Sequence, residues 1–329
     1  MKRQQRLALA QKRLTNVLRA HTVANDRTLE QKISDAGPLN QRIEPFILTK
    51  ARVGMLADGS LRAEKRGKTL WYYLSETEQE EVQRRLAELE PVYDATQEGE
   101  FKVRVGQALE IAVERALKES GRDYLGTHGG LEEHDDSTLY KKVEPPLVIS
   151  GQRMRKGPLD YIVFEPSGMA GIEVKNYRTW LYPDTSEVKD MLMKCSDIGA
   201  VPVLVARRVP FITFRLLNLS GCLVHQTYNQ RYPAAEAWLA ELVRDKKVLG
   251  YHDVRTGNEP DGRMRRFVCE LLPGLVEKAR PMFEAFRAEH AQYGSGDMSY
   301  DDWVKAILVG RGIWADRRGE EPEEYDPDM

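Results

Sequence analysis

Apolar residues near the start of the chain recur at α-helical spacing, at Leu7, Leu14, Val17 and Leu18. This pattern predicts a helix over residues 8–20. Two more helices are expected before residue 60, over 27–36 and 45–57. The earlier one should stop at Gly37-Pro38, and Pro45 suits the first turn of the later one. Two strand-like pieces then follow, at 61–64 and 69–74.

The next stretch is acidic and has helical composition. Ser75 and Glu78 have the spacing of a capping box, which predicts a connecting helix from Ser75 to about residue 90, stopped by Pro91. After residue 100, helices and short strands alternate, with 121–137 as a loop. This alternation predicts an α/β domain with a mixed sheet. The helices expected there are 101–120, 186–198, 234–243, 272–293 with Pro281 as a kink, and 299–308; the strands expected are 147–150, 159–165, 170–177, 201–206 and 221–225.

The order of the first elements, three helices and a hairpin with a basic tip, is that of a winged helix-turn-helix. Residues 6–75 resemble bacterial winged-helix proteins through Leu56-x-x-Gly59-x-Leu61 followed by RAEKRGKTLWYYLS. The resemblance implies that the third helix presents Lys50 and Arg52 to a DNA groove. It also implies phosphate contacts from the wing residues Lys65, Arg66 and Lys68. A winged helix can instead be a platform for a protein partner, and that alternative stays open.

Charge is distributed unevenly along a chain whose formal net charge is only −2. Residues 1–75 hold 15 Lys and Arg against 6 Asp and Glu, and residues 76–100 hold 2 against 9. A basic block in a nearly neutral protein is typical of a surface that binds phosphates, although a solvated helix face would have the same composition. The acidic end, residues 316–329, is expected to be disordered.

The remaining composition excludes several classes of protein. The three cysteines lie far apart without zinc-ligand spacing, so they are expected to be free thiols. No run of 18 apolar residues is present, so no membrane span is expected, and the charged start does not resemble a signal peptide. A cytoplasmic protein is the expectation.

The pattern with chemical content lies in two neighbouring predicted strands. Alternation places Glu173 and Lys175 on one face of their strand. If this strand pairs with the preceding one through the turn 166–168, Asp160 comes alongside Glu173. Two carboxylates and an ammonium would then share one surface. Convergent carboxylates suit a hard cation such as Mg²⁺, and a nearby lysine can orient or deprotonate a water for attack on a phosphodiester.

These residues resemble the core motif of the PD-(D/E)xK superfamily, which includes restriction endonucleases, Mrr-like enzymes and Holliday junction resolvases. Many members add a helix glutamate four residues after a glycine, and Gly106-Gln107-Ala108-Leu109-Glu110 matches that spacing, with Glu114 as a competitor one turn later. The resemblance covers about residues 100–230. It departs from the family's PD dipeptide, because Pro158-Leu159-Asp160 has one inserted residue.

The resemblance implies a restriction-endonuclease-like fold and an Mg²⁺- or Mn²⁺-dependent DNA endonuclease. Asp160, Glu173 and Glu110 would hold metal, and Lys175 would act on the water. Arg207 and Arg208 could clamp a phosphate of duplex or branched DNA. Family members commonly cut as homodimers, in bacterial or archaeal defence, restriction or repair. Two alternatives stay open: a catalytically inactive DNA-binding regulator, and an RNA-cleaving nuclease on the same fold.

The expected organisation has five parts. They are a winged helix-turn-helix over 1–75, an acidic helical connector over 76–99, a nuclease domain over 100–255, a helical extension over 256–315 and an acidic tail over 316–329.

Overall fold

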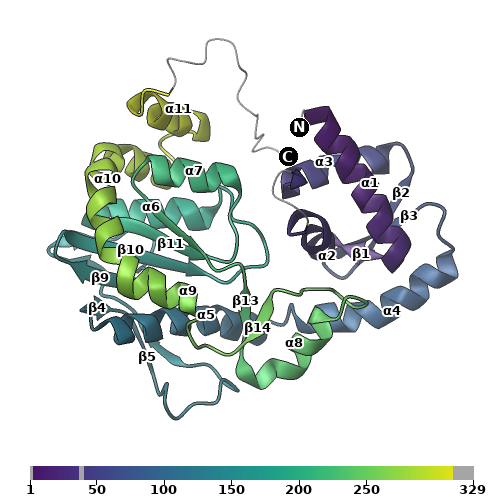
Figure 1. Cartoon of the computed structure of the whole chain (residues 1–329), viewed down its shortest axis with the longest axis horizontal. Coiled ribbons are helices and arrows are strands. Elements are labelled where there is room, and N and C mark those ends of the chain that lie inside the picture. Colours follow the sequence, from purple (N-terminus) through teal and green to yellow (C-terminus); the bar gives the residue numbers. More distant parts are fainter. Residues whose placement is uncertain (1–2, 37–40, 314–329) are drawn as a thin grey trace. The chain divides into compact units, whose positions relative to one another are not determined.

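A computed structural model describes residues 3–36 and 41–313 (Figure 1). It is a mixed α/β protein, which confirms the class expected from the alternating pattern. Its residues form two compact units. The N-terminal unit comprises the described residues up to Lys102 together with 236–256, and the sheet unit comprises 103–235 with 257–313.

These units differ from the expected organisation, because the expected connector, 76–99, belongs to the N-terminal unit and the expected helical extension is part of the sheet unit from residue 257 onward. Residues 236–256 belong to the N-terminal unit rather than to the domain with the large sheet. The reason is that α8 (Ala237–Arg244) packs against α4 (Gln79–Ala95), the acidic helix expected to be only a connector. The expected tail, 316–329, lies outside the described residues.

In the N-terminal unit, helices surround a small antiparallel sheet of strand order β1-β3-β2. The helix expected over 45–57 is confirmed as α3, and its buried Leu48 and Ala51 pack with Leu14 and Leu18 of the first helix. The elements are α1 (Arg3–His21), β1 (Ala24–Asn25), α2 (Asp26–Leu29), the π-helix η1 (Glu30–Ser34), α3 (Pro45–Ala57), β2 (Leu61–Arg66) and β3 (Thr69–Leu74). The expected stop at Gly37-Pro38 lies outside the described residues.

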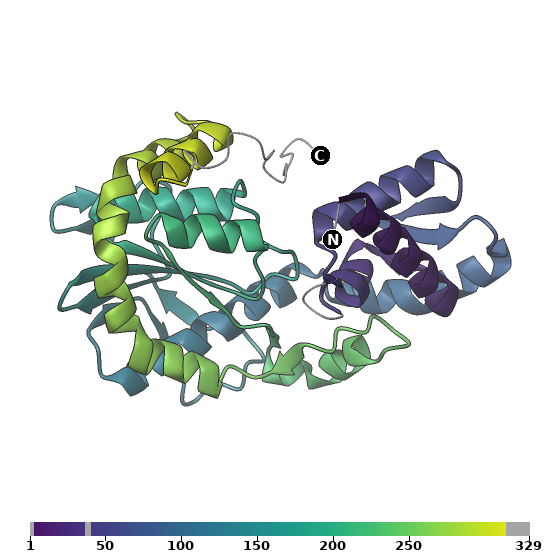
Figure 2. The ribbon, with the colours of Figure 1, turned by 45° about the horizontal axis from the view of Figure 1, so that its top comes forward.

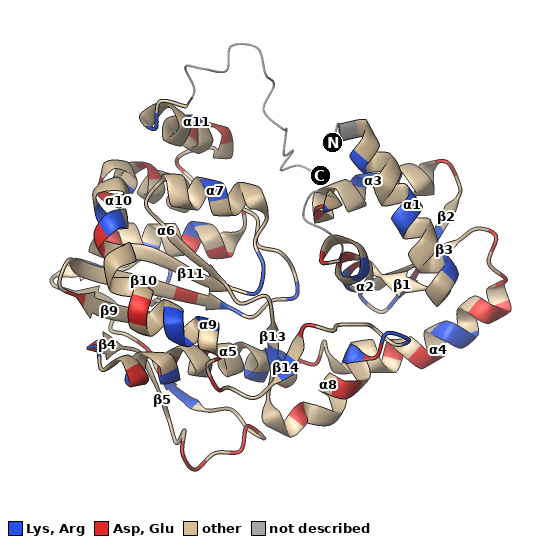
Figure 3. Cartoon of the chain, viewed as in Figure 1, with Lys and Arg blue, Asp and Glu red and all other residues tan. Residues whose placement is uncertain are grey.

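The predicted capping box is wrong. Helix α4 begins at Gln79 with Glu78 as its N-cap, and the Ser75 hydroxyl instead donates to the carbonyl oxygen of Ser60 at the base of the hairpin. The helix also continues through Pro91, which lies exposed inside it. Burial of Leu86, Leu89 and Tyr93 on both sides of the proline favours the continued helix over the local preference for a stop. Figure 3 shows acidic and basic residues along the whole of α4.

The sheet unit is built on a five-stranded sheet of order β12-β11-β10-β9-β4. Strands β10, β11 and β12 run parallel, and β9 and β4 are antiparallel to their neighbours. The bounds are β4 (Tyr124–Leu125), β9 (Tyr161–Glu165), β10 (Gly168–Lys175), β11 (Val201–Ala206) and β12 (Leu223–Gln226). Smaller strands of this unit lie at β5 (Thr127–Gly129), β6 (Lys141–Val143), β7 (Val148–Ile149), β8 (Gln152–Arg153) and β13 (Gln230–Tyr232), whereas β14 (Val254–Thr256) belongs to the N-terminal unit.

Helices cover both faces of this sheet (Figures 1 and 2). One face packs on α5 (Gly99–Ser120), α9 (Gly262–Arg265), the π-helix η4 (Arg266–Leu271) and the first half of α10 (Leu272–Ser295). The other face packs on α6 (Ser186–Ile198), α7 (Phe211–Leu219), the second half of α10 and α11 (Tyr300–Gly310). A short 3₁₀ turn, η3 (Ala234–Glu236), precedes α8.

Helix α10 passes from one face to the other across the amino ends of the parallel strands. Arg280 of α10 donates to the carbonyl oxygens of Met169 and Gly199, which lie at or just before the starts of β10 and β11. The amino ends are therefore covered by α10, and the site described below lies toward the opposite, carboxyl end of β10.

The local patterns located most elements well. The bounds expected for α6 and β11 are confirmed, and the region expected as a loop, 121–137, contains β4 and β5. Helix α7 was not expected, because its apolar residues include the exposed Phe211 and Phe214 and therefore form no clear one-sided stripe. Among the described residues, no helix is both long and apolar enough to cross a membrane.

Candidate active site

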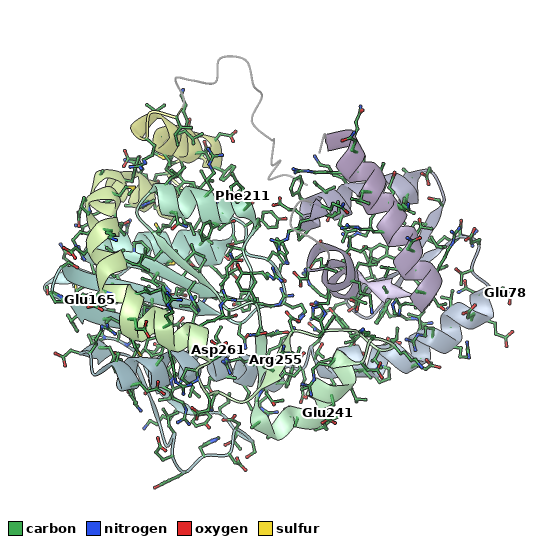
Figure 4. The ribbon with its side chains drawn as sticks, in the orientation of Figure 1. Glu78, Glu165, Phe211, Glu241, Arg255 and Asp261 are labelled. Carbon is green, nitrogen blue, oxygen red and sulfur yellow. The ribbon has the colours of Figure 1, made fainter. Side chains whose placement is uncertain are left out.

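The β9–β10 hairpin places Asp160 across from Glu173. Its paired residues run from Glu165 with Gly168 to Tyr161 with Ile172, and the next position in this register joins Asp160 to Glu173. This is the register expected from the turn at 166–168. Glu165 lies at the far end of β9, away from Asp160 (Figure 4).

The ammonium of Lys175 lies between the two carboxylates. Its Nζ atom is 2.7 Å from Oε1 of Glu173 and 3.9 Å from Oδ2 of Asp160. The same Oδ2 atom accepts the backbone N–H of Val174 at 2.8 Å, which holds the Asp160 side chain against β10. The structure therefore brings together the three residues predicted from the strand pattern.

The surface that these three groups share is largely closed to solvent. Asp160 is 8% exposed and Glu173 is 5% exposed, and the Lys175 side chain is 16% exposed. Helix α6 covers Glu173 and adds a second ammonium, because Nζ of Lys194 lies 3.5 Å from Oε2 of Glu173. A buried carboxylate requires such partners, since an unpaired charge is strongly disfavoured away from water.

Lys194 was missed by sequence reasoning, although the sequence contains a signal. Met191, Lys194, Cys195 and Ile198 recur at helical spacing, and all four are buried in α6. A lysine within such an apolar stripe must find an acidic partner inside the protein. The stripe alone does not identify that partner as Glu173.

Glu110 of α5 joins the site through a third lysine, Lys142. Nζ of Lys142 lies 2.8 Å from Oε2 of Glu110 and 2.5 Å from Oδ1 of Asp160. The hydroxyl of Tyr161 donates to the Glu110 carbonyl oxygen at 2.9 Å and connects α5 to the start of β9. Lys142 comes from β6 and lacked any motif that would have identified it.

The competing residue Glu114 lies one turn further along α5 and has different partners. Its Oε2 atom accepts both the backbone N–H and Nδ1 of His128 at 2.8 Å, and Lys118 lies 3.1 Å from its other oxygen. Nε2 of His128 lies 3.5 Å from Oε2 of Glu110. Glu114 is fully buried and serves to hold His128 and the β5 strand on α5.

A glycine allows Asp160 to take its position. Gly126, between β4 and β5, has φ +99°, and a Cβ atom there would collide with the carbonyl oxygen of Asp160 and lie 3.0 Å from the Tyr161 ring. Only glycine combines this backbone conformation with so close an approach. The chain therefore turns from the sheet into the β5–β6 hairpin directly against Asp160.

The pKa values follow from this alternation of acids and bases. Burial opposes ionisation of Glu110, but hydrogen bonds and charges from His128 and Lys142 outweigh it and lower the pKa of Glu110 to about 2. Burial and the Asp160 charge raise the pKa of Glu173 despite its two lysines. Burial disfavours the Lys175 ammonium, yet Glu173 and Asp160 raise its pKa. Lys175 therefore stays protonated at neutral pH and is a donor rather than a base.

Two of the three carboxylates, those of Glu110 and Asp160, are placed to bind a divalent cation. Glu110 and Asp160 each direct one oxygen at a single cationic atom, Nζ of Lys142, and carboxylate oxygens around one positive charge are the ligands that Mg²⁺ prefers. Glu173 instead faces Lys175 and Lys194. Within residues 3–36 and 41–313, no three His, Cys, Asp or Glu side chains are grouped closely enough to hold a metal. The pair formed by Glu110 and Asp160 is thus the part that fits.

The residues expected to contact DNA in the N-terminal unit differ in how far they are exposed. Arg52 is wrong as a groove-reading residue, because it is only 8% exposed, pairs with Asp26 and stacks 5.0 Å from the Tyr72 ring centroid. Lys65 and Lys68 are exposed near the tip of the β2–β3 hairpin. Lys50 is half-buried, as is Arg66, whose Nε lies 2.7 Å from Glu64 on the same strand.

The two arginines at the end of β11 also differ. Arg207 is 2% exposed and donates to the carbonyl oxygen of Arg178, so it belongs to the protein interior and is wrong as a phosphate clamp. Arg208 is half-buried, with its guanidinium 4.7 Å from the Tyr228 ring centroid and 5.9 Å from that of Trp180. The exposed Arg263 stacks on the same Tyr228 ring at 4.6 Å.

Comparison with known proteins adds no family assignment. No family model, no curated protein and no solved structure matches the chain.

Proposed function

We propose that the sheet unit is a metal-dependent phosphodiesterase of the restriction-endonuclease-like type, acting on DNA as an endonuclease. The observation that carries the proposal is the convergence of Asp160, Glu173 and Lys175 at the carboxyl end of β10, with Glu110 reaching the same cluster from α5. A charged strand without catalytic purpose would not need four acidic and basic side chains from three elements held together away from water.

Each residue of the cluster has a role that its surroundings support. Glu110 and Asp160 would hold the Mg²⁺ or Mn²⁺ ion, which when bound supplies charge stabilisation and lowers the pKa of a water. Lys175, kept protonated by its neighbours, donates to the water or to negative charge on a phosphate oxygen. Glu173, whose pKa is raised, is a better proton acceptor than Glu110 and is suited to take the proton of the attacking water.

For the N-terminal unit we propose a winged helix-turn-helix that holds the nucleic acid. The exposed Lys65 and Lys68 of the hairpin support phosphate contacts by this unit. Helix α3 offers fewer DNA contacts than the sequence implied, because Arg52 is buried and only the half-buried Lys50 remains of the two basic residues expected there. The same helix exposes the apolar Val53 and Leu56. A protein partner at this helix is the second candidate, and those two apolar side chains favour it.

The deciding experiment is a cleavage assay with matched variants. Purified protein is incubated with supercoiled, linear, branched and single-stranded DNA and with RNA, with Mg²⁺, with Mn²⁺ or with a chelator. We expect metal-dependent cleavage of DNA that Asp160→Asn, Glu173→Gln and Lys175→Met each abolish or greatly reduce. Asp160→Asn keeps an oxygen that can accept the Val174 N–H, so it removes charge with little change of shape.

Glu165→Gln is the control variant. Glu165 is also a buried β9 carboxylate, and it pairs with Arg122 at the other end of the strand. Cleavage should survive this change. Cleavage that survives Asp160→Asn and Glu173→Gln would place the chemistry elsewhere, cleavage of RNA alone would change the substrate class, and no cleavage under any condition would favour a DNA-binding regulator.

A further inference from the structure

Lys142 occupies a central position that the nuclease motif does not explain. Its ammonium is the only described group that touches both Glu110 and Asp160, at 2.8 and 2.5 Å. Without a cation between them, two carboxylates this close would repel each other inside a poorly solvated site. Lys142 therefore does electrostatically what a bound divalent ion would do for the same two oxygens.

The backbone that carries Lys142 is firmly attached to α5. Gln107, one turn before Glu110, exchanges two hydrogen bonds of 2.9 Å with the backbone of Tyr140, two residues before Lys142. Strand β6 also pairs with β5 in a register that sets Lys142 directly across from His128. Both side chains consequently face the acidic side of α5, and the Lys142 Cα position is fixed relative to Glu110.

The Lys142 side chain is partly exposed to solvent. It is 21% exposed, against 16% for Lys175 and 9% for Lys194, so part of it is in contact with solvent. The neighbouring β6 residues Lys141 and Val143 are exposed, so the strand itself lies at the protein surface. Because a lysine has a flexible four-carbon stem, rotation alone can carry its ammonium into water while β6 stays in place.

We propose that Lys142 is a resident counter-ion of the Glu110–Asp160 pair and that a divalent cation binds there by displacing its ammonium into solvent. The exchange is of one cation for another, with no covalent step. Lys142 then sets how tightly the site binds metal and preserves the pair when no metal is bound. This inference rests on the proposed function for the identity of the ligand, a hard divalent ion.

The test measures Mn²⁺ binding to the full chain by calorimetry, without nucleic acid. Lys142→Met removes the competing charge and should raise Mn²⁺ affinity by about tenfold or more. Lys142→Arg keeps the charge and should not raise it. Lys118→Met is the matched control, because Lys118 pairs with Glu114 rather than with Glu110 or Asp160, and the same loss of charge there should leave affinity near the wild-type value.

Adding Asp160→Asn to Lys142→Met should remove the gained affinity, which assigns it to this pair. Thermal unfolding provides a second measurement, and Lys142→Gln a second variant if the methionine variant folds poorly. Without metal both neutral variants should melt below the wild type, and Mn²⁺ should raise their melting temperature more than that of the wild type. An unchanged or weaker Mn²⁺ affinity in Lys142→Met and Lys142→Gln overturns the proposal, as does an equal gain in Lys118→Met.

The two proposals fail separately. Tight Mn²⁺ binding by Lys142→Met in a protein that cleaves nothing would support the exchange and reject the nuclease. Metal-dependent cleavage with Mn²⁺ affinity unaffected by Lys142 would support the nuclease and reject the exchange.

Discussion

One carboxylate oxygen of Glu114, Oε2, lies 2.8 Å from Nδ1 of His128, and the other ring nitrogen of that histidine faces Glu110 at 3.5 Å. An imidazole with an acid at each nitrogen is best satisfied when both nitrogens carry protons. Burial opposes this charge, but the neighbouring carboxylates of Glu110 and Glu114 outweigh it and raise the pKa of His128. When protonated, the histidine is a charged bridge between two successive turns of α5.

The first prediction concerns how stability depends on pH. A raised folded-state pKa stabilises the fold fully below the unfolded value, here 6.5, and this contribution is lost as pH rises through the folded pKa. His128→Asn can keep a donor toward Glu114 but cannot titrate. The difference in unfolding free energy between wild type and variant should be largest near pH 6 and shrink toward pH 9. Denaturant titrations at several pH values measure it, and a difference that is flat across this range would show that His128 is neutral.

The second prediction separates the two glutamates of α5. Glu110→Gln should abolish or greatly reduce metal-dependent cleavage, because Glu110 is one of the two carboxylates that converge on the cation position. Glu114→Gln should leave cleavage largely intact but lower the free energy of unfolding by about 1–3 kcal/mol, since it weakens two buried hydrogen bonds to His128. Cleavage rates and denaturant midpoints of both variants are compared, and the reverse pattern would make Glu114 the functional residue.

Much of this arrangement could be predicted because it is local. A short turn at 166–168 determines the β9–β10 register, and two-residue alternation then brings Asp160, Glu173 and Lys175 together. Glu110 was expected from the resemblance to the PD-(D/E)xK family, in which many members carry a helix glutamate four residues after a glycine, here Gly106. Lys142 could not be predicted, because it reaches the site through a hairpin whose strands are separated by residues 130–140 without a turn signature. The burial of Arg52 and Arg207 likewise depends on distant partners, and composition alone presents both as exposed basic residues.

The third prediction tests the basic hairpin of the N-terminal unit. Lys65→Glu combined with Lys68→Glu should weaken DNA binding and reduce the slope of log affinity against log salt by about 2, because fewer counterions are released. Arg52→Gln is the contrast: it should lower unfolding free energy by about 1–3 kcal/mol through loss of the Asp26 pair, with little change in the salt slope. Fluorescence anisotropy across a salt series measures the slopes. Equal slopes in the wild type and the double variant would direct attention to a protein partner.

The last prediction concerns Gly126, whose backbone lies against the carbonyl oxygen of Asp160. Gly126→Ala requires a side chain at φ +99° and also a Cβ atom in collision with the Asp160 carbonyl oxygen. Gly121→Ala is its control, because Gly121 has φ +67° but no atom within 4 Å of an added Cβ. In the control, the free energy of unfolding should fall only by the strain of a left-handed non-glycine residue, about 1–2 kcal/mol. In Gly126→Ala, the free energy of unfolding should fall by about 1–3 kcal/mol more because of the collision.

Relief of that collision moves Asp160. Cleavage and Mn²⁺ affinity should therefore fall in Gly126→Ala and stay at the wild-type level in Gly121→Ala, under conditions where both variants are folded. If both variants lose stability equally and bind Mn²⁺ equally, the close approach of Gly126 does not position Asp160, and the hydrogen bond from Val174 is sufficient to hold it.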